Sequence, residues 1–295
     1  MYTIKFCAFL LLLLTAQSVL TGFTCPGSVV WDNKLGIGPA WNQLYAQEHF
    51  TLNAQDNQQA KTIVIALDNP CVSLEGKSRV TFDEQFYAKG TIRGVFGSKG
   101  AFTFNQSTQV APFDVISNLD GLLTTIFFDW SLVGGIQTSV CNDRVVLSLG
   151  GGWFYIHGKR PITYIRDSKV ILYDTLNTPI VELGCAVHPT QDTTVSATYT
   201  AGLGWFSAHL DRCEFNDSIH YHFNKLFATT LILDGSYRVT DCCSVYLGAT
   251  WIISFNTQNG RVSNPPSLAA LFSNDVLYLF RAEYSIIALG LKFEF

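Results

Sequence analysis

Hydrophobic and polar residues alternate along much of the chain, which is the pattern of β-strands that have one apolar and one polar face. The last twelve residues, 284–295, show it most clearly. One face of this segment carries Ile287, Leu289, Leu291, Phe293 and Phe295, and the other carries Ala288, Gly290, Lys292 and Glu294. The chain is therefore expected to end on a β-strand whose last residue is aromatic.

The same alternation predicts six further strands, in the segments 122–140, 144–158, 178–188, 193–208, 226–240 and 244–255. Across all seven segments the apolar register holds no Asp, Glu, Lys or Arg, whereas charged residues do occur in the opposite register. They include Asp129, Glu182, Asp234, Arg238, Lys292 and Glu294. A lipid-facing surface requires this separation, because a cation at the bilayer midplane costs about 2–4 kcal/mol.

The alternative is a large β-sandwich, whose inner faces would be equally free of charge. Its outer faces would be rich in charged residues, but here the polar register is mostly Gly, Ser, Thr and Ala. Small residues suit a narrow, partly filled barrel lumen better. The pattern therefore favours an all-β, transmembrane, antiparallel up-and-down barrel with the six charged residues facing the lumen.

Less regular alternation at 61–68, 79–88 and 90–104 adds the strands needed for a barrel of about ten. A barrel of eight strands with an N-terminal extension is the main alternative, and twelve strands is a more distant one. Residues 25–60 combine Gly, Pro and an Asn/Gln-rich stretch, and they are expected to form an irregular lead-in or a lumen plug. The barrel would then occupy residues 61–295.

The lengths of the predicted links alternate between short and long. Short links fall at 141–143, 189–192 and 241–243, and long ones at about 105–121, 159–177, 209–225 and 257–279. Bacterial outer-membrane barrels have this asymmetry, with tight periplasmic turns and longer outer loops. It also places aromatic residues near both predicted interfaces, where amphipathic rings are enriched.

Composition supports a membrane location. Of the 295 residues, 48% are hydrophobic and only 14% are charged, against a usual charged share of about 25%. Beyond the N-terminus no apolar run reaches the roughly 18 residues of a spanning helix. Residues 1–24, with Lys5 and the apolar run 6–14, are expected to be a secretory signal peptide.

The C-terminal signature Leu291, Phe293 and Phe295 resembles the final strand of Gram-negative outer-membrane β-barrels, which closes the barrel and ends in Phe. The resemblance implies the outer membrane as location. It also implies outer-membrane lipid and the barrel-assembly machinery as partners. The net charge of −4 gives no indication of nucleic-acid binding.

Seven of the eight cysteines lie after the predicted signal peptide. Three of them, Cys141, Cys242 and Cys243, fall on the predicted periplasmic rim and could form disulfides or crosslinks. A barrel that ends in Phe and carries several cysteines resembles the cysteine-containing outer-membrane proteins of Chlamydiae in architecture and cysteine content. The resemblance implies disulfide-linked envelope proteins as partners. Buried free thiols with one local disulfide are the alternative.

One predicted outer segment contains His209, Asp211, Asp217, His220 and His222, which are residue types that can act in catalysis. A His-Asp pair at a barrel mouth is similar to the omptin family of outer-membrane proteases, which are ten-stranded and of similar length. Those proteases also need a second acidic pair, and Asp167 and Asp174 in the neighbouring segment are not paired in sequence. A solvated polar loop is the favoured interpretation, so no catalytic residue is assigned.

No metal or cofactor site is assigned either. His220 and His222 could bind a metal only incidentally, and Gly150–Gly152 lacks the Lys and Ser/Thr of a phosphate loop. The leading functional prediction is a porin-like or structural envelope barrel that passes small solutes at most. An outer-membrane hydrolase with its site at the extracellular mouth, and an adhesin or surface antigen using long loops, are the alternatives.

Overall fold

The computed structural model describes residues 29–54, 57–97, 100–108, 117–123, 126–164, 169–212, 217–263 and 272–294. The predicted signal peptide, Cys25, Asp167, Cys213 and Phe295 lie outside these ranges. Among the described residues, no helix is long and apolar enough to cross a membrane.

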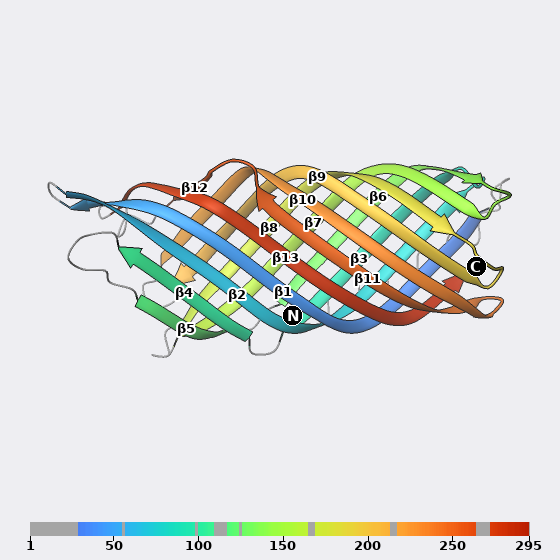
Figure 1. Cartoon of the computed structure of the whole chain (residues 1–295), viewed down its shortest axis with the longest axis horizontal. Helices are drawn as coiled ribbons and strands as arrows, with labels where there is room; N and C mark the ends of the chain where they lie inside the picture. The colour runs from blue at the N-terminus through green and yellow to red at the C-terminus, as the bar shows by residue number, and fades with distance from the viewer. Residues whose placement is uncertain are drawn as a thin grey trace.

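The described chain is built from antiparallel β-strands that wrap into a closed barrel whose strands are steeply tilted to the long axis (Figure 1). The strands are β1 (Val29–Ala54), β2 (Asn57–Phe82), β3 (Phe86–Gly97), β4 (Gly100–Thr108), β5 (Ser117–Leu123), β6 (Ile126–Val140), β7 (Val145–Tyr164), β8 (Lys169–Val187), β9 (Thr193–Arg212), β10 (Asp217–Thr240), β11 (Cys243–Asn256), β12 (Gly260–Ser263) and β13 (Phe272–Glu294).

The barrel has ten strands in cross-section, because β3 with β4, and β5 with β6, each make one interrupted strand of the wall. Short β12 is the extra strand and pairs with β10 and β13. Closure is made by β13, which pairs with β1 from Asp32↔Glu294 to Leu52↔Phe272. The predicted ten-stranded transmembrane barrel is confirmed.

The wall follows the alternation predicted from the sequence. Side chains such as Leu149, Leu183 and Leu247, 49%, 55% and 57% exposed, point outward, while Phe154 and Glu182, at alternate positions of the same wall, are buried inside. A contiguous apolar surface of this extent is far larger than water-soluble monomers expose. The outward face is therefore the lipid-facing face.

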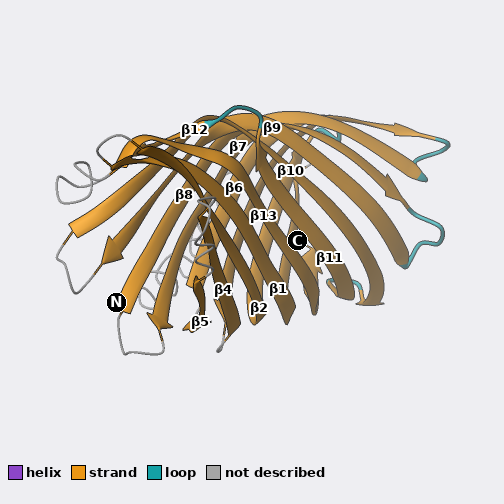
Figure 2. Cartoon of the chain, turned by 60° about the vertical axis from the view of Figure 1, so that its left-hand side comes forward, coloured by secondary structure: helices purple, strands orange, loops and turns teal. Residues whose placement is uncertain are grey.

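The β2–β3, β6–β7, β8–β9 and β10–β11 hairpin turns lie at one end of the barrel, together with the C-terminal end of β13 (Figure 1). We call this the periplasmic end, since outer-membrane barrels place their tight turns there. Figure 2 shows the wall continuing as strand toward the opposite, extracellular end, with no helix among the described residues.

Three expectations are corrected. Residues 25–60 are not an irregular lead-in or plug over their described part, because Val29–Ala54 form β1 and pair with both β13 and β2. The segment 79–88 is not one strand but spans the β2–β3 hairpin, whose turn residues Asp83 and Glu84 have positive φ. The sequence alternation does not reveal this turn, because Phe82 and Phe86, on either side of its three residues, both fall on even positions.

The long outer links are also much shorter than expected. β7 extends to Tyr164 and β8 begins at Lys169, while β9 reaches Arg212 and β10 begins at Asp217. Strand pairing continues there although charged residues such as Lys159 and Asp211 interrupt the apolar alternation. Most of the predicted loops at 159–177 and 209–225 are therefore extensions of the wall.

Candidate functional site: the filled lumen

The lumen in the periplasmic half of the barrel holds charged side chains from strands far apart in the sequence. β1 contributes Lys34, β2 contributes Glu75 and Lys77, β3 contributes Arg93, and β10 contributes Asp234. Each is in the inward register of its strand, since the intervening residues Leu35, Leu74 and Leu233 are exposed to lipid. Alternation of side chains along each strand thus directs these charges inward.

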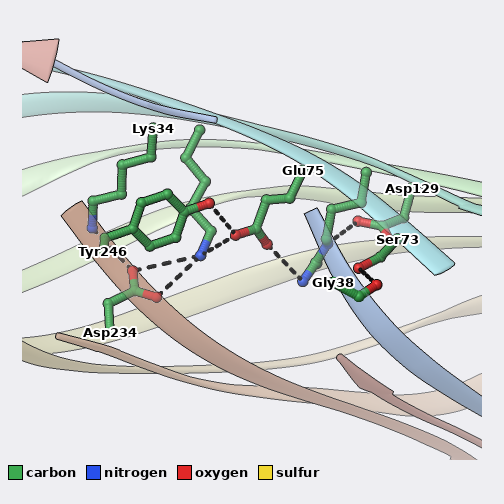
Figure 3. A network of polar contacts seen from close by, with 9 residues as sticks. Lys34, Gly38, Ser73, Glu75, Asp129, Asp234 and Tyr246 are labelled. Atoms are coloured by element: carbon green, nitrogen blue, oxygen red, sulfur yellow. Dashed lines mark hydrogen bonds and ion pairs between the residues drawn. The ribbon is translucent and has the colours of Figure 1, made fainter. Parts of the chain in front are cut away.

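These side chains form one connected network (Figure 3). Lys34 and Lys77 bind the carboxylate of Asp234, with Nζ–O distances of 3.0 and 3.3 Å, and Lys77 also lies 2.9 Å from Glu75 Oε1. The Tyr246 hydroxyl donates to the same Oε1 at 3.3 Å. Glu75 is thereby joined to groups on both sides of the lumen.

The network ends at Arg93 and Asp129, which face each other on β3 and β6. Arg93 Nε donates to Asp129 Oδ1 at 2.9 Å, and its Nη1 lies 3.9 Å from Glu75 Oε2. Their side chains are 2% and 0% exposed. Charges buried this completely are tolerated only when paired, because each would otherwise retain a desolvation penalty of several kcal/mol.

A second cluster lies against β7 and β8. Glu182 accepts from Lys89 Nζ at 2.6 Å and from the Tyr87 hydroxyl at 3.2 Å, while the Arg79 guanidinium lies 4.3 Å from the centre of the Tyr87 ring. Tyr87 needs the space left by Gly150, where an added Cβ would lie 2.4 Å from its hydroxyl oxygen. This explains one glycine of the 150–152 run as a packing requirement.

Closer to the periplasmic end, Lys292 Nζ binds Asp32 Oδ2 at 3.2 Å. Lys292 and Asp32 belong to β13 and β1, the strands that close the barrel. An ion pair inside the lumen therefore joins the two strands that close the barrel.

Above the ionic layer, toward the extracellular end, the lumen is packed with aromatic rings, together with buried polar side chains such as Asn42 and Asp174. The rings of Phe127 and Tyr284, on β6 and β13, have centroids 4.4 Å apart, and Phe206 and Phe280, on β9 and β13, have centroids 4.3 Å apart. All four side chains are at most 5% exposed. Aromatic contacts of this kind stabilise beyond the area they bury, so the upper lumen is a packed core.

The predicted lumenal charges are placed as follows. Asp129, Glu182, Asp234 and Lys292 point inward and are paired, as described above. Arg238 keeps the inward register, opposite Ser244, but lies at the open periplasmic end where its side chain is exposed. The Glu294 side chain lies outside the described residues.

Sequence reasoning missed most of the cationic partners. Lys34, Lys77, Lys89 and Arg93 lie in the N-terminal strands that were predicted poorly, and they face carboxylates up to 200 residues away. One usable signal was present, because Glu75, Lys77 and Arg79 occur at every second position.

The predicted barrel-closing residues lie on the closing strand. Leu291 pairs with Leu35 of β1 and is 45% exposed to the lipid side, and Phe293 pairs with Asn33. Phe295 lies outside the described residues.

The periplasmic cysteines are at turns, but the disulfide is not found. Cys141, in the β6–β7 turn, and Cys242, between β10 and β11, are exposed, and Cys243 is partly exposed. All five described cysteines are free thiols.

The histidines and acids weighed as a catalytic site do not converge on the lumen. His209 and Asp211 share the outward face of β9 with Trp205, whereas Asp174 of β8 is 3% exposed and faces inward. The side chain of Asp217 lies outside the described residues. Within the described part of the chain, no three His, Cys, Asp or Glu residues are grouped as metal ligands.

The closed fold and the apolar outer surface define the protein as a transmembrane β-barrel, and this fold matches that of Gram-negative outer-membrane barrels. Among solved structures the chain is similar to the outer-membrane protease OmpT of Escherichia coli, with a TM-score of 0.69 and 12% identity. The match covers 93% of this chain and 98% of that one.

The chain also matches OprG of Pseudomonas aeruginosa (TM-score 0.33, 8% identity, covering 90% of this chain and 95% of that one). A third match is the toluene transporter TodX of Pseudomonas putida (TM-score 0.31, 8% identity, covering 92% and 90%). No protein-family model and no curated protein matches the chain. The likeness to OmpT is therefore one of fold.

Proposed function

We propose that this protein is a structural outer-membrane barrel with a closed lumen, and that it does not act as a diffusion pore. The observation that carries the proposal is the ion pair between Lys77 of β2 and Asp234 of β10, 3.3 Å apart. Strands β1, β13 and β11 separate these two in the wall, so the pair bridges the lumen and does not merely line it.

Two layers of side chains support closure. The ionic layer contains buried Glu75, Arg93 and Asp129, and the layer above it contains the Phe127–Tyr284 contact between β6 and β13. A barrel of this size is near the limit at which side chains fill the interior. A solute would have to displace both layers to pass.

Planar-bilayer recordings test the proposal. The wild-type chain, purified in its heat-modifiable folded form, is expected to insert without stepwise conductance. One variant that combines Asp234→Ala, Tyr246→Ala, Phe127→Ala and Tyr284→Ala truncates side chains in both layers, and it is expected to conduct. As a matched control, Trp251→Ala removes an aromatic side chain from the lipid face and should remain silent.

Stepwise, reproducible conductance by the wild type would overturn the closed-lumen proposal in favour of a porin. The hydrolase alternative gains no support from the positions of His209, Asp211 and Asp174, which lie on opposite faces of the wall. The adhesin alternative depends on outer segments beyond the described residues.

We also propose that the exposed periplasmic thiols link the barrel to cysteine-containing envelope proteins, as the chlamydial-type resemblance implies. The thiolate of Cys141 or Cys242 would attack a disulfide of the partner, forming a mixed disulfide and releasing the partner's second sulfur as a thiolate. Outer-membrane fractions run without reductant should then show high-molecular-weight bands that disappear in a Cys141→Ser, Cys242→Ser variant. If the bands persist in this variant, Cys141 and Cys242 are not the residues that form the crosslinks.

A further inference from the structure

Two histidines lie side by side on the outer face of the barrel wall, toward its extracellular end. His209 of β9 and His220 of β10 are directly paired in register, and their ring centroids are 5.8 Å apart. We propose that His209 and His220 form a two-histidine binding site for a divalent transition-metal ion. Neither residue takes part in the closed lumen.

Both rings face away from the barrel interior. On β9 the residues Phe206 and Ala208 are buried in the lumen, so His209 follows Trp205 on the outward face. A register shift between Phe223 and Leu226 reverses the parity of β10, so that Phe223 is buried and His220 is exposed. Without this bulge the two imidazoles would lie on opposite sides of the wall.

The spacing fits chelation by two imidazoles. A nitrogen–metal bond is about 2.0–2.1 Å, so two rings on one tetrahedral ion have centroids roughly 5 Å apart. The observed 5.8 Å, with the ring planes 33° apart, requires only small side-chain rotations. Directly paired residues on adjacent antiparallel strands are also the closest pairs that a sheet offers.

Neighbouring side chains hold both rings in place. Tyr173 of β8 stacks on His209, with centroids 4.6 Å apart and planes 15° apart. His220 Nε2 lies 3.0 Å from Ser218 Oγ. If Nε2–H donates to that oxygen, Nδ1 is left with its lone pair for a metal, which is the second-shell arrangement typical of metal-bound histidine.

Charges of both signs surround the pair, including Lys159 Nζ, which lies 5.4 Å from the centre of the Tyr173 ring. Asp211 lies on the same face of β9, two residues from His209, and supplies a negative charge. His222 is paired instead with Arg261 of β12, whose positive charge opposes cation binding there. Because no third ligand is grouped with the pair among the described residues, water would complete the coordination.

Imidazole ligands select Cu²⁺, Zn²⁺ and Ni²⁺ over Mg²⁺ and Ca²⁺, with Cu²⁺ bound most tightly. The test is a titration of the full chain in detergent micelles with Cu²⁺ and Zn²⁺, followed by calorimetry and by Cu²⁺ electron paramagnetic resonance. The thiols are alkylated beforehand, since they would also bind these ions. One Cu²⁺ per chain is expected, with coupling to two imidazole nitrogens.

His209→Asn and His220→Asn should each weaken Cu²⁺ binding at least tenfold and remove the two-nitrogen signal. The matched control is His157→Asn, which alters another histidine, bound to Thr175 Oγ1 at 3.2 Å, and should bind like the wild type. Unchanged binding by both variants would overturn the proposal. So would a loss in His222→Asn while His209→Asn binds normally, because the site would then lie along β10. Heat-modifiable migration shows that each variant is folded.

Discussion

Removing Arg93 from the lumen should destabilise the barrel more than removing any exposed arginine. The side chain is 2% exposed and faces two carboxylates, Asp129 at 2.9 Å and Glu75 at 3.9 Å. In Arg93→Met the Asp129 carboxylate stays buried beside a neutral group, while Glu75 keeps its ion pair with Lys77. Breaking a buried pair in this way costs about 3–5 kcal/mol, which lowers the folded-to-unfolded ratio by roughly two to three and a half orders of magnitude.

The assay is urea-induced unfolding of the refolded barrel in lipid vesicles, followed by tryptophan fluorescence. Arg281→Met is the control, because Arg281 pairs with Glu283 at 3.0 Å but is 59% exposed, and exposed pairs contribute about 0–1 kcal/mol. Neutralising the stranded acid as well, in Arg93→Met with Asp129→Asn, should recover most of the loss, because Glu75 keeps its ion pair with Lys77 at 2.9 Å. Equal costs for Arg93→Met and Arg281→Met would refute the reasoning, since the lumenal charges would then be solvated.

Three further outcomes are expected from the same unfolding assay. Leu289→Arg places a cation on the lipid face, where Leu289 is 58% exposed, and should cost about 2–4 kcal/mol; a cost near zero would mean that lipid does not contact this face. Phe127→Ala empties part of the upper lumen, where Phe127 is 2% exposed, and should cost about 3–5 kcal/mol, whereas a cost below about 1 kcal/mol would contradict a packed core. Gly152→Ala should reduce the folded fraction, because its Cβ would lie 2.0 Å from a backbone oxygen of the neighbouring strand, while Gly151→Ala, with nothing closer than 3.8 Å, should not; the expectation fails if the two variants fold equally well.

The lipid-facing register was predictable because it obeys a rule local to each strand. Lipid excludes charge from every second position, so Leu183, Leu247 and Leu289 could be assigned outward without knowing their neighbours. The same rule failed in β1, where Pro39 and a run of polar residues obscure the outward Leu35, Ile37 and Trp41.

The filling of the lumen could not be predicted in the same way. Which inward residues meet depends on barrel closure and strand stagger, and the Tyr246–Glu75 contact joins residues 171 positions apart. Inward Phe127 and Phe206 also blurred the polar register, so the upper lumen was expected to be small and polar rather than aromatic. Alternation reports the face of a residue but not its partner across the lumen.

The described side chains that occupy the lumen belong to the wall itself, with Asp234, Glu75 and Tyr284 each fixed to a strand by its own backbone. A gate needs a moving part, such as a domain that can withdraw or a loop that can fold back. Among the described residues the barrel has none, so under the closed-lumen proposal this part of the molecule would open only if strands parted from one another. Permeability and unfolding should then share one barrier, and any condition that makes this membrane protein leak should also begin to denature it.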